Sequence, residues 1–205
     1  MSNVRALFVT SLALVLAAVP AARAQQAQAQ PTAMPAAQQA MMEAWTKSMA
    51  VGENHQRLAR MAGEWDVTTT AWMAPGQPPQ VSKGTVTNSM LLGGRVLQSQ
   101  LKSDMMGQPF DGLGLTGYDN VTGRFWTIWL DSMSTGLFHA SGSYDPATSS
   151  YTYTGEMADP MIPGSIVKVR AVTRVTGPDS YVFEWYDTHE GKEMRSLEVS
   201  YTRRK

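Results

Sequence analysis

The sequence predicts an all-β fold, an up-and-down antiparallel β-barrel of about ten strands, lipocalin-like, behind an N-terminal α-helical segment. From residue 63 onward, short runs rich in Thr, Val, Tyr, Phe and Trp alternate with clusters of Gly, Pro, Asp and Asn. These clusters are too short for a crossover helix, so neighbouring strands must pair antiparallel. Ten strands in an open sheet would leave two unpaired edges, and closure into a barrel removes both.

The first 24 residues have the features of a secretory signal peptide. Arg5 supplies the positive start, residues 6–19 are apolar apart from Thr10 and Ser11, and Ala22-Arg23-Ala24 fits the cleavage rule. We therefore expect an exported protein, periplasmic or extracellular, that begins at Gln25. The alternative is a transmembrane anchor, but the apolar run is shorter than the about 20 residues that a span needs.

Residues 25–35 are rich in Gln, Ala and Pro and predict a disordered tether. N-terminal helices are expected over 36–62. The apolar residues spaced every four positions are Ala37, Met41, Trp45 and Met49. Gly52 ends this helix, and Asn54 is expected to cap a second helix with Leu58 and Met61 facing inward. The methionine-rich stripe is expected to pack against the barrel, with a partner-binding face as the alternative.

The barrel domain is expected over 63–205. Its predicted strands are 64–73, 81–91, 96–104, 110–118, 124–131, 136–144, 150–156, 165–175, 181–187 and 194–203. A Tyr-Asp repeat ends two of them, at Asp119 and Asp145, with Thr122 and Thr148 three residues on. In both copies the Asp is expected to bond the backbone two residues on and the Thr to close the turn. A calcium loop would need more oxygen ligands at alternate positions.

The start of the first strand carries Gly63-Glu64-Trp65, which resembles the lipocalin and calycin signature. That resemblance implies that Trp65 closes the barrel floor and that an Arg near the last strand packs over it. Arg203 and Arg204 stand at the matching place. We expect Trp65 to be buried, with one of these two arginines across its ring.

A more specific resemblance covers residues 53–205, to the bacterial family known as domain of unknown function 1579. It rests on Glu53-Asn54-His55, Gly63-Glu64-Trp65, Leu92-Gly93-Gly94-Arg95, the stretch from Gly107-Gln108-Pro109-Phe110 to Gly114, Gly117-Tyr118-Asp119-Asn120, Trp129-Leu130-Asp131 and Thr135-Gly136. The resemblance implies a lipocalin-like barrel. It implies no established activity and supplies no catalytic residues.

Composition removes several function classes. The 17 basic and 17 acidic side chains give zero net charge, which argues against nucleic acid as a partner. The chain has no cysteine, so thiol catalysis and thiolate metal sites are ruled out. No two histidines have the spacing of a metal pair, and we expect neither a metal nor a cofactor. No stable membrane anchor is expected after cleavage, and a protein partner is left open.

The candidate ligand-binding residues are Arg95, Phe110, Trp129, Asp131, His139, Phe183 and Trp185. On two strands, aromatic residues and then an Asp share one face, and inward orientation would give an aromatic wall with an acidic rim. Arg95 is expected to orient an acidic headgroup, or to pair with an Asp at the mouth. Gly112, Gly114 and Gly117 on the fourth strand add no side-chain volume to the interior, which favours a cavity there. The alternative is that these glycines only let the strand coil sharply.

The leading hypothesis is an exported protein that binds a small apolar or amphipathic ligand in the barrel. One alternative is an isomerase or cyclase with Asp131 and His139 as weak candidates for the acid–base pair. The other is a structural or interaction module with a filled barrel.

Overall fold

The computed structural model describes residues 34–74 and 76–205. The predicted signal peptide at 1–24 and residues 25–33 of the predicted tether lie outside them. Two helices precede ten strands: α1 (Ala36–Met49), α2 (Glu53–Ala59), β1 (Gly63–Ala71), β2 (Gln80–Leu91), β3 (Val96–Met105), β4 (Gln108–Asp119), β5 (Arg124–Asp131), β6 (Phe138–Asp145), β7 (Ser150–Ala158), β8 (Ile166–Gly177), β9 (Ser180–His189) and β10 (Lys192–Arg203).

The ten strands form one closed barrel in sequence order, and β1 closes on β10. Every neighbouring pair is antiparallel, as the short connections predicted. Trp65 on β1 lies opposite Val86 on β2 and Arg203 on β10, so closure brings the two ends of the domain together. The predicted up-and-down barrel is confirmed.

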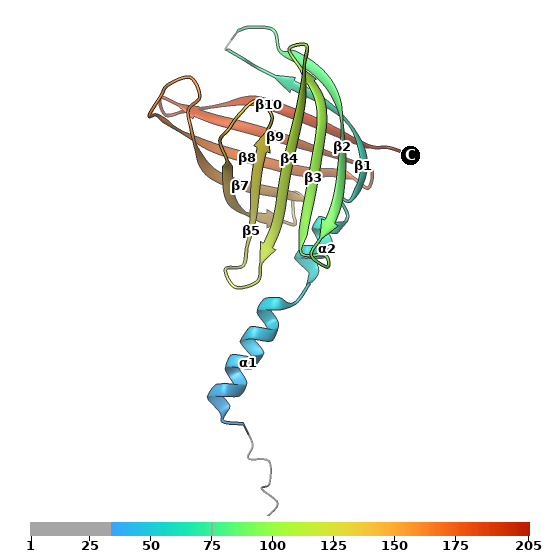
Figure 1. The fold of residues 1–205 in the computed structure, drawn as a ribbon, viewed down its shortest axis with the longest axis vertical. Helices are drawn as coiled ribbons and strands as arrows, with labels where there is room; N and C mark the ends of the chain where they lie inside the picture. Colours follow the sequence, from blue (N-terminus) through green and yellow to red (C-terminus); the bar gives the residue numbers. More distant parts are fainter. Residues whose placement is uncertain (1–33, 75) are drawn as a thin grey trace, which may run out of the picture.

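The two ends of the barrel differ (Figure 1). At the end that we call the floor, α2 lies beside the β2–β3 turn, and Leu58 and Met61 are buried. In an up-and-down barrel the connections alternate between ends. The β1–β2, β3–β4, β5–β6, β7–β8 and β9–β10 connections therefore share the opposite end, which we call the mouth.

Helix α2 begins at Glu53 with Gly52 as its N-cap, so the predicted cap at Asn54 is wrong. Asn54 lies in the first turn, and the backbone N–H of Gly52 donates to Nδ1 of His55 at 3.2 Å. His55 is buried and meets the Tyr118 ring edge-on, with 5.8 Å between ring centroids. The histidine thus fixes both the start of the helix and its seat on the barrel.

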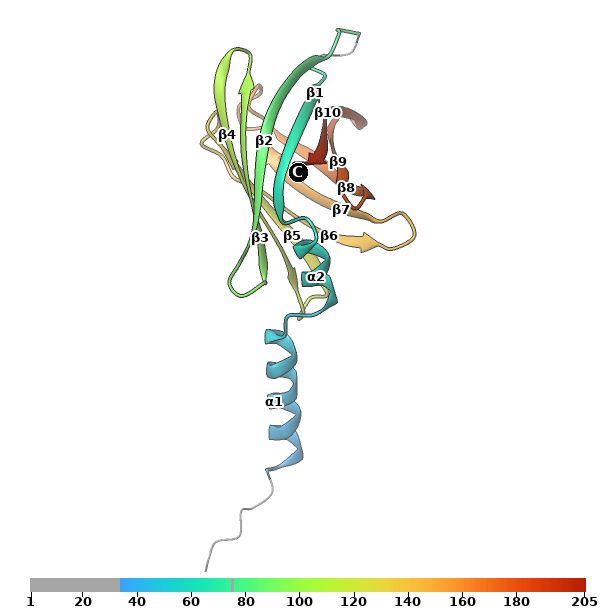
Figure 2. The same cartoon turned by 90° about the vertical axis from the view of Figure 1, so that its right-hand side faces the viewer.

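Helix α1 stands away from the barrel in both views (Figures 1 and 2) and has no buried residue. The expectation that its apolar stripe packs against the barrel is therefore wrong, and Trp45 is 61% exposed. Only the C-terminal end is held: Asn120 Nδ2 donates to the carbonyl of Ala50 at 2.7 Å, and Arg95 donates to that of Met49 at 2.7 Å. No helix in the described part of the chain is long and apolar enough to cross a membrane.

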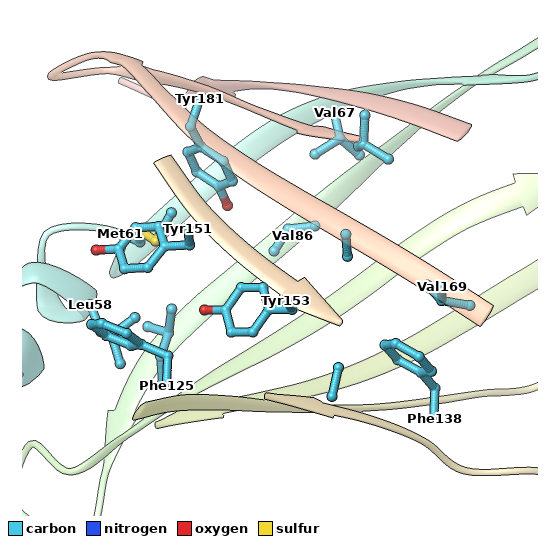
Figure 3. Close-up of a cluster of buried hydrophobic side chains, with 14 of the residues drawn as sticks. Leu58, Met61, Val67, Val86, Phe125, Phe138, Tyr151, Tyr153, Val169 and Tyr181 are labelled. Atoms are coloured by element: carbon cyan, nitrogen blue, oxygen red, sulfur yellow. The ribbon is translucent and has the colours of Figure 1, made fainter. Parts of the chain in front are cut away.

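The core extends from the floor into the mouth half of the interior, and aromatic rings from the inner strand faces make up much of it (Figure 3). Tyr181 stacks on Tyr201 at 4.0 Å and meets Trp65 edge-on at 4.7 Å. Burial raises the pKa of Tyr181 well above its usual value, because an ionised phenol would lose its hydration there. Burial likewise raises the pKa of Tyr151 to about 12.

Candidate functional site

The floor is sealed by hydrogen bonds around Trp65, which is 2% exposed. Its indole Nε1–H donates to the carbonyl oxygen of Met61 at 2.9 Å, and Asn88 Nδ2 donates to the same oxygen at 2.9 Å. Asn88 also donates to the hydroxyl of Tyr181 at 3.1 Å. These bonds tie the end of α2 to β1, β2 and β9 and close the floor end of the barrel.

Arg203 lies across the Trp65 ring, with its guanidinium carbon 4.1 Å from the ring centroid. It also donates to the carbonyls of Ala62 at 2.7 Å and Arg60 at 2.8 Å, so one side chain joins β10 to the helix end. Arg204 does not share this role. It turns outward and its Nε donates to Asp66 at 3.1 Å, since neighbouring residues on a strand face opposite sides.

Two matching tryptophan–aspartate pairs occupy the inner face toward the mouth. On β5 the Trp129 Nε1–H donates to Oδ2 of Asp131 at 3.1 Å, and on β9 the Trp185 Nε1–H donates to Oδ1 of Asp187 at 2.6 Å. All four residues are partly buried. The aromatic face points inward on both strands, since Trp129 and Trp185 pack against the core.

Phe138 lies between the two pairs. It is the cross-strand neighbour of Trp129 on β6, and its ring contacts Trp185 with 4.5 Å between centroids. Phe183 adds a further ring 6.3 Å from Trp185. We call Trp129, Phe138, Phe183 and Trp185 the aromatic platform. Because each indole N–H is engaged by an Asp two residues on, the two tryptophan rings are fixed in orientation.

Tryptophan rings fill the space beside the glycines of β4, so the expectation of a cavity there is wrong. A Cβ on Gly112 would lie 2.4 Å from the Trp129 ring, and one on Gly114 would lie 3.4 Å from it. Gly117 makes the same room for Trp126 on the outer face, at 2.3 Å. The glycines therefore let indole rings lie flat on the strand.

Two candidate residues lie away from the platform. His139 is exposed on the outer wall, because Phe138 and Ala140 take the inward positions of β6. Leu137, two residues before it, precedes the strand and is exposed to solvent. Arg95 lies at the floor end, where it holds α1, and it cannot orient a headgroup at the mouth.

Phe110 is buried on the inner face of β4, opposite Ser103. An open hollow with a volume of about 460 Å³ lies at the mouth end of β3, β4 and β5. It is lined by Gln100, Leu101, Lys102, Asp111, Gly112, Leu113, Leu130, Asp131 and Ser132. The side chains of Gln100, Lys102, Asp111, Leu113 and Leu130 alternate along their strands with the inward Leu101, Gly112 and Asp131. This hollow therefore lies on the outer wall and is separate from the platform.

Sequence reasoning left Phe138 and Asp187 out of the candidate site. Asp187 had a signal, since it shares the face of Phe183 and Trp185, as Asp131 shares that of Trp129. The sequence signal for Phe138 was weaker. The small residues Ala140 and Gly142 follow it at every second position on β6 and mark the inner face.

The fold and the platform define a class: a ten-stranded barrel sealed at one end, with a rigid aromatic lining toward the other. The chain belongs to the family described as "Protein of unknown function (DUF1579)", whose model matches residues 50–203. Helix α1 lies wholly before this match.

Among solved structures, the chain is similar to that of Rv2717c from M. tuberculosis, with a TM-score of 0.58 and 13% identity over 76% of this chain and 100% of the other. At that identity the likeness shows the barrel fold alone. A redesigned beta barrel shares 14% identity over 73% of this chain and 96% of its own, with a TM-score of 0.38, too distant to bear on the fold. No curated protein matches the chain significantly.

Proposed function

We propose that this protein binds a small apolar or amphipathic molecule on the aromatic platform at the barrel mouth. The observation that carries this is the pair of indole rings, each fixed by an Asp and set on either side of Phe138. Rings held in place before binding offer contact area at little cost in conformational entropy. Trp129, Phe183 and Trp185 are only partly buried, so the platform keeps exposed surface for a ligand.

The charges near the platform bear on the ligand. Asp131 and Asp187 are the charged groups bonded to its rings, whereas Arg95 is at the floor end. A fatty acid would bring its carboxylate toward these two, and like charges repel. We therefore expect a ligand with a neutral or cationic headgroup instead of an acidic one, because cations are also attracted to indole faces.

Binding is a better account than catalysis for the residues at hand. The candidate acid–base pair was Asp131 with His139, but the Asp bonds the inward Trp129 while the His is exposed on the outer wall. Proton transfer needs the two groups within hydrogen-bond reach of one substrate. Asp131 and His139 face opposite sides of the barrel wall, so they do not reach one substrate.

The test is a fluorescence titration with a cationic and an anionic hydrophobic dye of matched size. We expect a saturable change in tryptophan emission with the cationic dye, and loss of most of it in the double variant Trp129→Phe, Trp185→Phe. Trp126→Phe is the matched control, since Trp126 is on the same strand as Trp129 but faces outward. An unchanged titration in the double variant would contradict the proposal.

Export remains part of the proposal and rests on the first 24 residues. We expect the mature chain to begin at Gln25 in the periplasm or the medium. Intact mass measurement of the exported fraction tests this, and a chain that retains Met1 there would contradict it.

A further inference from the structure

Three strands that run toward the mouth end in the same short motif, an aspartate followed two residues later by a methionine. The three copies are Asp104-Met105-Met106, Asp131-Ser132-Met133 and Asp159-Pro160-Met161. They stand at or just beyond the ends of β3, β5 and β7. The barrel topology brings all three to one end, although they are far apart in the sequence.

In each copy the carboxylate accepts backbone N–H groups of the loop that follows. Asp104 accepts from Gly107 at 2.7 Å, Asp131 from Met133 at 3.0 Å, and Asp159 from Met161 at 2.8 Å and Ile162 at 3.2 Å. These four N–H groups are thus bonded by the carboxylate at the strand end. A loop tip whose donors are already bonded loses less when it leaves water.

The side chains at the tips are apolar and exposed. Met106 is 66% exposed, Met133 47%, Met161 85% and Ile162 58%. We call these four residues the methionine rim. The loops that carry them, 105–107, 132–137 and 160–165, consist entirely of uncharged residues. Exposed apolar side chains that gather at one end of a molecule mark an interaction surface.

We propose that the methionine rim docks this protein on a lipid bilayer, with the barrel mouth facing the membrane. Separate loop tips can each enter the interfacial region of a bilayer, whereas a protein partner needs one contiguous packed surface. The fluid bilayer also suits methionine, whose flexible thioether adapts to irregular surroundings. The inference goes beyond ligand binding and does not require it.

The charges predict how this docking behaves. The rim has no cationic side chain, so attachment rests on apolar burial and does not need anionic lipids. The β9–β10 turn carries Glu190 and Lys192, so that side of the mouth stays in water and the barrel docks tilted. Few apolar side chains take part, so the attachment is weak and reversible.

The experiment is sedimentation of the mature protein with vesicles of pure phosphatidylcholine. We expect partitioning that survives high salt and falls at least tenfold in the triple variant Met106→Gln, Met133→Gln, Met161→Gln. Gln is close to Met in size and is uncharged, and the replaced side chains are exposed, so the fold should persist.

Two control variants locate the effect. Leu92 and Val121 are exposed at the floor end, at 73% and 76%, and Leu92→Gln with Val121→Gln should leave partitioning unchanged. Met41→Gln with Trp45→Gln tests helix α1, which projects from the same end. Loss of vesicle binding in either control with retention in the rim variant would overturn the proposal.

A second measurement reports the orientation directly. The chain has no cysteine, so Met133→Cys and Val121→Cys each give a single site for an environment-sensitive dye. Only the label at 133 should shift to the blue on vesicles. Equal shifts at both sites, no binding to any vesicle, or a rim variant that changes only self-association would each contradict lipid docking.

Discussion

The two ends of the barrel use the same turn chemistry with different side chains at the tip. At the floor end, Asp119 accepts the N–H of Val121 at 2.8 Å and the hydroxyl of Thr122 at 2.9 Å. At the mouth end, Asp131 accepts the N–H of Met133. An aspartate at a strand end thus builds the turn in both places, and in the two floor turns, at Asp119 and Asp145, a threonine three residues on adds a second bond to it.

The Tyr-Asp repeat confirms the turn interpretation of the sequence. In its second copy Asp145 accepts the N–H of Ala147 at 2.9 Å and the hydroxyl of Thr148 at 2.8 Å. The Thr148 hydroxyl lowers the pKa of Asp145, as the Val121 N–H lowers that of Asp119, because both bonds favour the ionised form. The repeat is duplicated architecture at the floor end.

The ends also differ in how they are filled, and the largest predicted effect tests this. Trp65→Ala should lower the free energy of unfolding by about 3–5 kcal/mol, because it leaves a void under Arg203 and removes a bond to Met61. Urea denaturation measures it, with exposed Trp45→Ala as a near-neutral control. A loss no larger than that of the control would mean that the floor is not sealed by this side chain.

The floor tyrosines predict a loss of stability at alkaline pH. Burial raises the pKa of Tyr151 to about 12, above the unfolded value of about 10. The folded state then keeps a proton that the unfolded state releases, so stability is full below pH 10 and falls as the pH rises toward 12. Tyr181 extends the loss further, since its pKa is also raised.

Circular dichroism and tyrosinate absorbance, followed together with pH, measure this loss. Tyr151→Phe removes one ionisable group without changing the ring, so it should weaken the pH dependence above pH 10. Tyrosinate that forms at pH 10 in a fully folded barrel would contradict the burial of these hydroxyls.

Much of the barrel could be predicted from the sequence because the pattern is local. Alternation and turn residues give ten strands, and short connections give their order. The inner face of β6 was missed, because His139 and its neighbours carry no clear alternation and the phase of a strand depends on where pairing begins. Pairing of Phe138 with Trp129 sets that phase, and it is a contact between strands.

The fate of α1 and of the β4 glycines was also beyond local reasoning. An apolar stripe predicts a buried helix face, but α1 is held by its end through Asn120 rather than by its face. Gly112 predicts free volume only until a ring from the next strand fills it. Both outcomes depend on contacts with side chains that are distant in the sequence.

The filled glycine position gives a prediction for the mouth half. Gly112→Ala should cost about 1–3 kcal/mol, because the new methyl group would lie 2.4 Å from the Trp129 ring and must displace it. Gly114→Ala is the matched control on the same strand, since its Cβ would meet the same ring at 3.4 Å and needs much less movement. Thermal unfolding compares the two, and equal stabilities would show that the ring is free to move.

The smallest predicted effect concerns the bond that fixes the platform. Asp131→Asn should cost about 0.5–1.5 kcal/mol, the usual net value of one hydrogen bond, because the amide keeps an acceptor but loses the charge that strengthens the Trp129 bond. The variant should loosen the indole ring more than it destabilises the fold, since Trp129 is partly buried and packs against the core rather than within it. Tryptophan anisotropy in a variant that keeps only Trp65 and Trp129 reports ring motion, and Asp187→Asn is its control because Asp187 bonds neither of these two indoles. If anisotropy stays unchanged with Asn at 131 while dye affinity falls, the carboxylate acts on the ligand by its charge. If both fall, ring fixation contributes to binding, and the mouth then differs from the floor in holding rings for a ligand rather than for the core.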